Sequence, residues 1–382
     1  MPAGSHSDLR AFSVGAATAF LAVPVCKRVA IRTGLVSHLR PDRWGRRETP
    51  LLGGLAVLSA TTTASLLFCG SASLPLLCGA WTCFGLGLAD DRRTFGPREK
   101  MIGVAAAYAV ERIAALLVWD QDQPVYCADA GIPAGISAGA SGATIARSLI
   151  ALLEMAACVG GSNSFNLTDN MDGAAAGIGA ISASALVGVW KVRREAPRGD
   201  PATGDTAALV PAWRSCFSAG LAGSCLGFLA WNAPPAGIFL GDAGSLPVGY
   251  ILSRLSMGDR ARPAAGVGRV FLVLAIPAAD ALFVLSRRMI KRRPLFKGGL
   301  DHLSHLLAQK GLEEPLPALC LLAAQTAACA LAVRALPGTR RPAYGHPGSR
   351  GSFFWPGLAA VAGAGILLLA GRTRNAQKKR PG

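Results

Sequence analysis

Long apolar runs recur along almost the whole chain, and each approaches the length of a membrane-spanning helix. A helix needs about 20 mostly apolar residues to cross the hydrocarbon core of a bilayer. The candidate spans lie at 11–31, 51–69, 74–89, 101–118, 148–162, 173–190, 213–231, 245–257, 269–286, 315–334 and 353–371. They predict an all-α fold, a polytopic membrane bundle of about eleven helices that forms one domain over residues 1–382.

The charged residues agree with a membrane protein and give it an orientation. Only 16% of the residues are charged, against roughly a quarter in soluble domains. Eleven spans place alternate loops on opposite sides, and the set containing 26–50, 90–100, 163–172, 232–244, 287–311 and the tail 372–382 holds 23 Lys and Arg against 14 in the other set. The positive-inside rule therefore predicts a multi-pass protein of the cell membrane with its N-terminus outside and its basic C-terminal tail in the cytoplasm. Membrane orientation accounts for the net charge of +17, so we expect no nucleic-acid partner.

The polar motifs of the chain all fall in the loops predicted to be cytoplasmic. An acidic pair ends one apolar run in "GLADDRRTFGPREK", and a second loop reads "NSFNLTDNMDG" with polar residues three apart. Side chains three residues apart share one helix face. The third and fourth loops read "FLGDAGSLPVG" and "RRPLFKGGLDHLSHLL". The candidate residues are Asp90, Asp91, Lys100, Asn163, Asn166, Asp169, Asp172, Asp242, Arg292, His302 and His305.

These side chains suit phosphoryl transfer with a metal-bound diphosphate. Carboxylate and carbonyl oxygens are the ligands that Mg²⁺ prefers, and it commonly takes substrate phosphates as further ligands. Cationic side chains nearby suit recognition of the diphosphate. Each motif alone also has a structural interpretation: a helix end that meets water, asparagines that join membrane helices, or a basic anchor. One shared site explains all four loops together.

Four motifs in this order resemble the polyprenyl-phosphate N-acetylhexosamine-1-phosphate transferases, over about residues 32–307. The resemblance implies an all-helical membrane bundle, often a homodimer, with its active site in a cytoplasmic cleft. It also implies a Mg²⁺ cofactor, with Mn²⁺ as a substitute. The donor would be a UDP-N-acetylhexosamine and the acceptor an undecaprenyl or decaprenyl phosphate. The products would be a polyprenyl-diphospho-sugar, which starts a cell-envelope glycan, and UMP.

The resemblance also assigns roles to individual residues. Asp90 and Asp91 match the acidic pair of the family, and Lys100 matches its basic partner. Asn166 and Asp242 match Mg²⁺ ligands. The positions that match the nucleotide and sugar-phosphate site are Asn163, Asp169, Asp172, Arg292, His302 and His305. Asp280, inside the span 269–286, is a secondary candidate because an ionisable group at that depth is often functional; a structural pair with Arg254 or a contact with the backbone is the alternative.

The chain departs from the family pattern at three places. Thr94 or its neighbours stand where the family often has an acid a few residues after the acidic pair. The usual Asp-Gly-X-Asp-Gly-Leu is replaced by residues 169–174, "DNMDGA", and the histidine loop has two histidines. That loop is more similar to the GlcNAc branch than to the phospho-MurNAc-pentapeptide transferase branch, which stays an alternative. A weakly active, drug-binding homologue that gives resistance is another alternative. A transporter would use its acids as an ion path within the spans and would show internal repeats, whereas the acidic motifs here gather in loops and no internal repeat is seen.

Overall fold

The structure is a computed structural model, and it describes residues 5–37, 48–118, 141–195, 212–257, 263–294, 299–313 and 315–334. The predicted span 353–371 and the basic tail 372–382 lie outside the described residues. Within the described ranges the chain is almost entirely helical, apart from a short antiparallel pairing of β1 (Val36–Ser37) with β2 (Thr49–Pro50). The all-α prediction is therefore confirmed.

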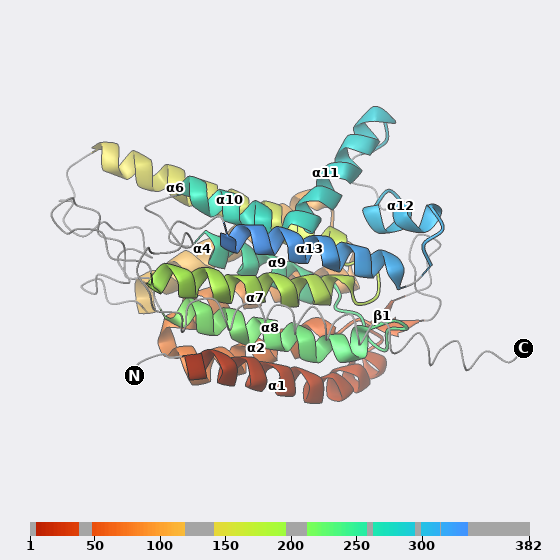
Figure 1. The fold of residues 1–382 in the computed structure, drawn as a ribbon, viewed down its shortest axis with the longest axis horizontal. Helices are drawn as coiled ribbons and strands as arrows, with labels where there is room; N and C mark the ends of the chain where they lie inside the picture. The colour runs from red at the N-terminus through yellow and green to blue at the C-terminus, as the bar shows by residue number, and fades with distance from the viewer. Residues whose placement is uncertain are drawn as a thin grey trace, which may run out of the picture.

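Each predicted span between 11–31 and 315–334 falls on helical segments. The helices are α1 (Ser5–Arg32), α2 (Gly53–Cys69), η1 (Gly70–Ser73), α3 (Leu74–Arg92), α4 (Pro97–Val118), α6 (Ser141–Thr168), α7 (Ala174–Glu195), α8 (Trp213–Asn232), α9 (Asp242–Ser256), α10 (Pro263–Val273), α11 (Ala275–Ile290), α12 (Leu303–Gln309) and α13 (Leu316–Arg334). In Figure 1, α1, α8, α7 and α13 run side by side across the molecule. The chain is a multi-pass membrane protein.

The number of long, apolar spans is smaller than the predicted eleven. Within the described residues, six helical runs are long and apolar enough to cross a membrane, or seven if α10 and α11 count as one bent span. The predicted spans 51–69 and 74–89 form an uninterrupted helical run over Gly53–Arg92, but the chain reverses at Gly70, which has φ +64°, and Trp81 of α3 donates to Thr62 of α2 at 3.1 Å. The helix α9 has only 15 residues, and its side chains from Ala243 to Ser256 are all buried within the protein.

The predicted span 269–286 is broken rather than continuous. The axes of α10 and α11 differ by 82°, and Pro277 lies in the first turn of α11, where its ring is incompatible with a helix that continues from Val273. Gln325 of α13 satisfies the backbone at the break, since it accepts from the N–H of Ile276 at 3.0 Å and donates to the carbonyl of Val273 at 2.6 Å. Unpaired backbone groups are costly inside a membrane, so Gln325 stabilises the bend.

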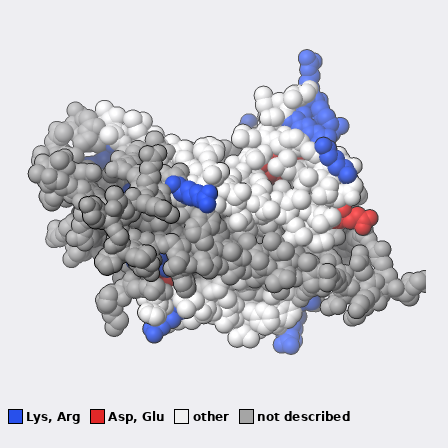
Figure 2. Space-filling view, in the orientation of Figure 1, with Lys and Arg blue, Asp and Glu red and all other residues white. Residues whose placement is uncertain are grey.

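The far end of α11 projects from the helical bundle, with α12 beside it (Figure 1). Figure 2 shows Lys and Arg side chains gathered at this projection. Lys291, Arg292 and Arg293 are exposed there. This location agrees with the basic loop predicted for 287–311.

A buried ion-pair network joins α4, α6 and α9. Arg254 lies 2.7 Å from Glu111 and 3.5 Å from Glu154. Tyr250 donates to Glu111, and Tyr108 donates to Glu154 at 2.7 Å. All five side chains are buried. The alternative that Asp280 pairs with Arg254 is therefore wrong, because two glutamates occupy the guanidinium.

Candidate active site

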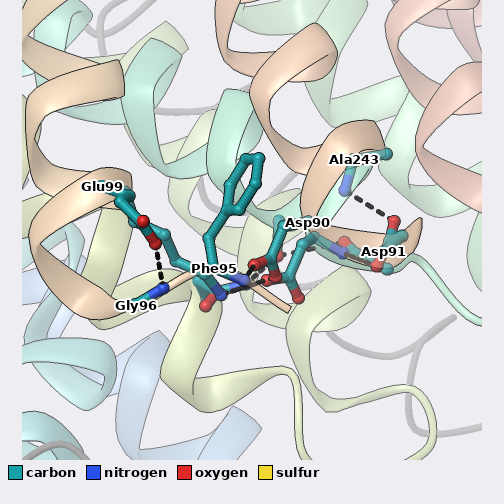
Figure 3. Close-up of polar contacts among 11 residues, drawn as sticks. Asp90, Asp91, Phe95, Gly96, Glu99 and Ala243 are labelled. Atoms are coloured by element: carbon teal, nitrogen blue, oxygen red, sulfur yellow. Dashed lines mark hydrogen bonds and ion pairs between the residues drawn. The ribbon is translucent and has the colours of Figure 1, made fainter. Parts of the chain in front are cut away.

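The acidic pair lies in the last turn of α3, as the sequence predicts. The helix ends at Arg92, and Arg93 is extended with φ −134° and ψ 102°. The backbone N–H of Phe95 donates to Asp90 Oδ1 at 2.6 Å and closes the turn that follows (Figure 3). Asp90 is thus fixed by the loop between α3 and α4.

Asp91 holds the start of α9. Its Oδ1 accepts from the backbone N–H of Asp242 at 3.0 Å, and its Oδ2 accepts from that of Ala243 at 3.1 Å; Figure 3 shows the Ala243 contact. The N–H groups at a helix start have no partner within the helix, and a carboxylate there is favoured by the helix dipole. Gly241 has φ +72°, and a Cβ on it would lie 2.8 Å from Asp91 Oδ2. The glycine therefore permits both the turn and the close approach of the carboxylate.

Lys100 joins the acidic pair to Asp242. Its Nζ lies 2.8 Å from Asp90 Oδ2 and also binds Asp242 Oδ2. Glu99 accepts from the backbone N–H of Gly96 at the start of α4 (Figure 3), which fixes the first turn that carries Lys100. The ends of α3, α4 and α9 thus bring together three carboxylates and one ammonium group.

Asn166 of α6 completes this cluster. Its Nδ2 donates to Ser245 Oγ at 2.8 Å, and its side chain also hydrogen-bonds Asp242. Asn163 lies one turn earlier and donates to the carbonyl of Val159 in its own helix at 2.8 Å. Ser245 was not among the residues singled out from the sequence; its place three residues after Asp242 is the only local signal for it.

The helical ladder predicted for residues 163–172 does not extend beyond Asn166. The helix α6 ends at Thr168, and Gly173 has φ +75° in the turn before α7. Asp169 and Asp172 therefore lie in a turn rather than on the helix face of Asn163 and Asn166. The prediction from the spacing by three, that all four side chains share one helix face, is therefore wrong for Asp169 and Asp172.

Asp172 faces the segment between α8 and α9. Its Oδ2 accepts from the backbone N–H of Ala236 at 2.8 Å. Burial raises the pKa of the Asp172 carboxyl, and this hydrogen bond opposes the shift. Asn232 supports the same region, since it accepts from the N–H of Gly173 at 3.1 Å and donates to the carbonyl of Ile238 at 2.9 Å. Asn232 closes an otherwise apolar run, which was the only sequence signal for it.

The histidine segment is attached to α11 through Asp280. His302 Nδ1 lies 2.8 Å from Asp280 Oδ2, and Asp280 Oδ1 accepts from the backbone N–H of Leu303 at 2.7 Å. The rings of His302 and His305 are 6.1 Å apart between centroids, and both side chains are buried. Asp280 thus fixes the orientation of His302 and the start of α12.

Arg292 is the predicted site residue that stands apart. It is exposed at the end of α11 with φ +49°, and none of the contacts found among the described residues joins it to the acidic cluster. Arg287 and Arg288 instead lie 3.6 and 3.5 Å from Asp301, next to His302.

The donor set fits a hard divalent cation in chemistry. Asp90, Asp91 and Asp242 supply carboxylate oxygens, and Asn166 supplies an amide oxygen, which are ligand types that Mg²⁺ accepts. Within the described residues no group of three or more His, Cys, Asp and Glu side chains has the arrangement of a metal site. Instead the Lys100 ammonium lies between Asp90 and Asp242, so these carboxylates already hold a positive charge between them.

Comparison with known proteins identifies the family. The family model of glycosyl transferase family 4 matches residues 73–258. The chain is 32% identical over 312 residues to the phospho-N-acetylmuramoyl-pentapeptide-transferase of Mycolicibacterium paratuberculosis, which covers 75% of this chain and 85% of that protein. It is 30% identical over 286 residues to the enzyme of the same name from Mycolicibacterium gilvum, covering 66% and 76%.

A second kind of relative is equally similar. The chain is 32% identical over 319 residues to the decaprenyl-phosphate N-acetylglucosaminephosphotransferase of Mycobacterium tuberculosis, covering 77% of this chain and 74% of that protein. The chain belongs to glycosyl transferase family 4, and within it to the phosphosugar transferases that these relatives represent.

Proposed function

We propose that this protein transfers a sugar-1-phosphate, most simply GlcNAc-1-phosphate, from a UDP-sugar to a polyprenyl phosphate at the cytoplasmic face of the cell membrane. The observation that carries the proposal is the convergence of Asp90, Asp91, Asp242 and Lys100 at the ends of α3, α4 and α9. The helices α3 and α4 are mostly apolar, so a polyprenyl chain in the bilayer can bring its phosphate to the cluster. The names of the relatives support both substrates.

In the proposed reaction an oxygen of the lipid phosphate attacks the β-phosphorus of the UDP-sugar. A new P–O bond forms to the lipid, the bond between the β-phosphorus and the bridging oxygen breaks, and UMP leaves with that oxygen. A phosphate monoester has a second pKa of about 6 and is largely a dianion at neutral pH. The nucleophile thus arrives mostly deprotonated, and we assign the acids to positioning and charge neutralisation rather than to proton removal.

The residues of the cluster have separate tasks in this scheme. Asp242 and Asn166, with Asp90, would hold Mg²⁺, which when bound neutralises negative charge on the diphosphate. Asp91 keeps the start of α9, and with it Asp242, in place through two backbone hydrogen bonds. When Asp90 and Asp242 hold the metal, Lys100 is the cation that would bind a phosphate oxygen. Asp169, Asp172 and the two histidines would line the nucleotide-sugar side.

The donor sugar has two candidates. The two histidines of the 302–305 segment favour the GlcNAc branch, whereas the pentapeptide transferases among the relatives favour UDP-MurNAc-pentapeptide. A drug-binding homologue with little turnover is the candidate from another class. Its only support is the departure from the family pattern at residues 170 and 174.

A substrate panel tests the proposal. The full chain, purified in lipid nanodiscs, is incubated with decaprenyl phosphate, Mg²⁺ and UDP-GlcNAc, UDP-GalNAc or UDP-MurNAc-pentapeptide, and UMP release is followed. We expect turnover with one N-acetylhexosamine donor that requires both the lipid phosphate and the metal. Turnover only with the pentapeptide donor would select the alternative branch. No turnover with any donor, together with tight binding of a nucleoside antibiotic, would select the drug-binding alternative.

A further inference from the structure

Asn170, in the turn after α6, makes two well-defined contacts. Its Nδ2 donates to the carbonyl of Leu167 at 2.9 Å. Its Oδ1 accepts from Ser304 Oγ at 2.7 Å. A carbonyl can only accept, so the amide orientation follows from the Leu167 contact and leaves Oδ1 for the serine. One side chain therefore connects the end of α6 to α12.

The two segments joined by this contact carry different halves of the proposed nucleotide-sugar site. The turn after α6 contains Asp169 and Asp172, and α12 is flanked by His302 and contains His305. The helix α12 has seven residues, too few to be stable by itself. It depends on contacts with other elements. At the start of α12, Asp280 of α11 contacts Leu303 and His302, and Asn170 of the turn after α6 contacts Ser304.

We propose that Asn170 is a positioning residue that holds α12 against the acidic turn and so sets the spacing between the histidines and Asp169 and Asp172. The inference rests on the proposed function for its catalytic consequence, but the attachment of α12 itself does not. In the proposed function the diphosphate-linked sugar lies between the histidines and the acids. It is therefore the ligand that Asn170 positions.

Because Ser304 is buried, the contact predicts unequal effects for the substitutions of Asn170 and Ser304. Ser304 is 1% exposed, whereas Asn170 is half-buried. Removal of the acceptor leaves a buried hydroxyl without its partner, which costs more than removal of the hydroxyl itself. Asn170→Ala should therefore be more damaging than Ser304→Ala. The double variant should be no worse than Asn170→Ala alone, because both changes abolish the same bond.

The test is a double-mutant cycle with two readouts on the full chain in nanodiscs. The first readout is hydrogen exchange of the backbone amides of α12, measured by mass spectrometry without substrate. We expect exchange about ten-fold faster in Asn170→Ala, with Ser304→Ala intermediate. The second readout is steady-state kinetics. We expect the KM for the UDP-sugar to rise about three- to ten-fold, with the KM for polyprenyl phosphate unchanged.

Ser184→Ala is the matched control. The Ser184 hydroxyl donates only within its own helix, to the carbonyl of Ala180 at 2.8 Å, so the same chemical change should alter neither readout. Unchanged exchange in α12 and additive effects of Asn170→Ala and Ser304→Ala would overturn the proposal. Faster exchange in a protein whose wild type turns over no UDP-sugar would keep the attachment of α12 and reject the proposed function. An equal rise of both KM values would reject the positioning role.

Discussion

At the scale of single residues, Asp242 is the side chain on which most of the cluster depends. It binds Lys100, contacts Asn166 and presents its backbone N–H to Asp91. Asp242→Asn keeps the shape and the backbone contact but removes the charge. We expect turnover to fall at least about 100-fold, with an unchanged melting temperature and little rescue by excess Mg²⁺.

A matched control for this change lies at another end of the bundle. Asp8 of α1 is buried and pairs with Lys191 at 3.0 Å, far along the chain from every site residue. Asp8→Asn removes a buried carboxylate in the same way and should leave turnover unchanged. A near-normal rate in Asp242→Asn would show that this carboxylate is not a metal ligand.

Substitution of Asp91 distinguishes a positioning role of this carboxylate from a role as general base. Both of its oxygens accept backbone hydrogen bonds from α9, a geometry suited to positioning. If it positions Asp242, the rate lost in Asp91→Asn should be nearly constant from about pH 6 to 9, because the lipid phosphate is already ionised. The measurement is the pH profile of this variant against wild type. Recovery toward the wild-type rate at alkaline pH would identify Asp91 as a base.

At the scale of helices, the close approach of α3 to α9 holds the acidic cluster together. A Cβ on Gly87 would lie 2.2 Å from the carbonyl oxygen of Asp242, whereas a Cβ on Gly85, half a turn away, would meet nothing within 4 Å. Gly87→Ala should destabilise the protein by about 1–3 kcal/mol and lower turnover by displacing Asp242. Gly85→Ala should be neutral or stabilising by up to about 1 kcal/mol. Thermal unfolding in detergent compares them, and equal melting temperatures would contradict this packing.

The helices show which parts of the site could be predicted from sequence. The end of α3 at Asp90 and Asp91 was predictable, because the apolar run stops there and a basic loop follows. The break between α10 and α11 had a signal in Pro277 that uniform hydrophobicity concealed. The contact of Asp91 with the start of α9 had none, since residues 91 and 242 are brought together only by the packing of α3 on α9. The same holds for Asn170 and Ser304.

At the scale of the whole molecule, the predicted orientation places the cluster in the cytoplasm. Single cysteines introduced into a cysteine-free background test it in sealed cells. Ser71→Cys lies in the exposed turn η1 at the opposite end of α3 from Arg93→Cys, and both positions are exposed. We expect a membrane-impermeant maleimide to label position 71 but not position 93. Labelling of position 93, or of cysteines at positions 90 or 242, would contradict the predicted orientation and place this end of α3 outside the cell.

The central claim is that a phosphosugar, rather than a sugar alone, passes to the lipid. Incubation of the purified chain with polyprenyl phosphate and UDP-GlcNAc labelled with ³²P at the β-phosphate follows the bond that breaks. We expect the label to move into the organic-soluble lipid while unlabelled UMP is released, and we expect Asp242→Asn to abolish the transfer. Label that stays in water-soluble UDP while the sugar enters the lipid would contradict the account, because the bond broken would then be the glycosidic one.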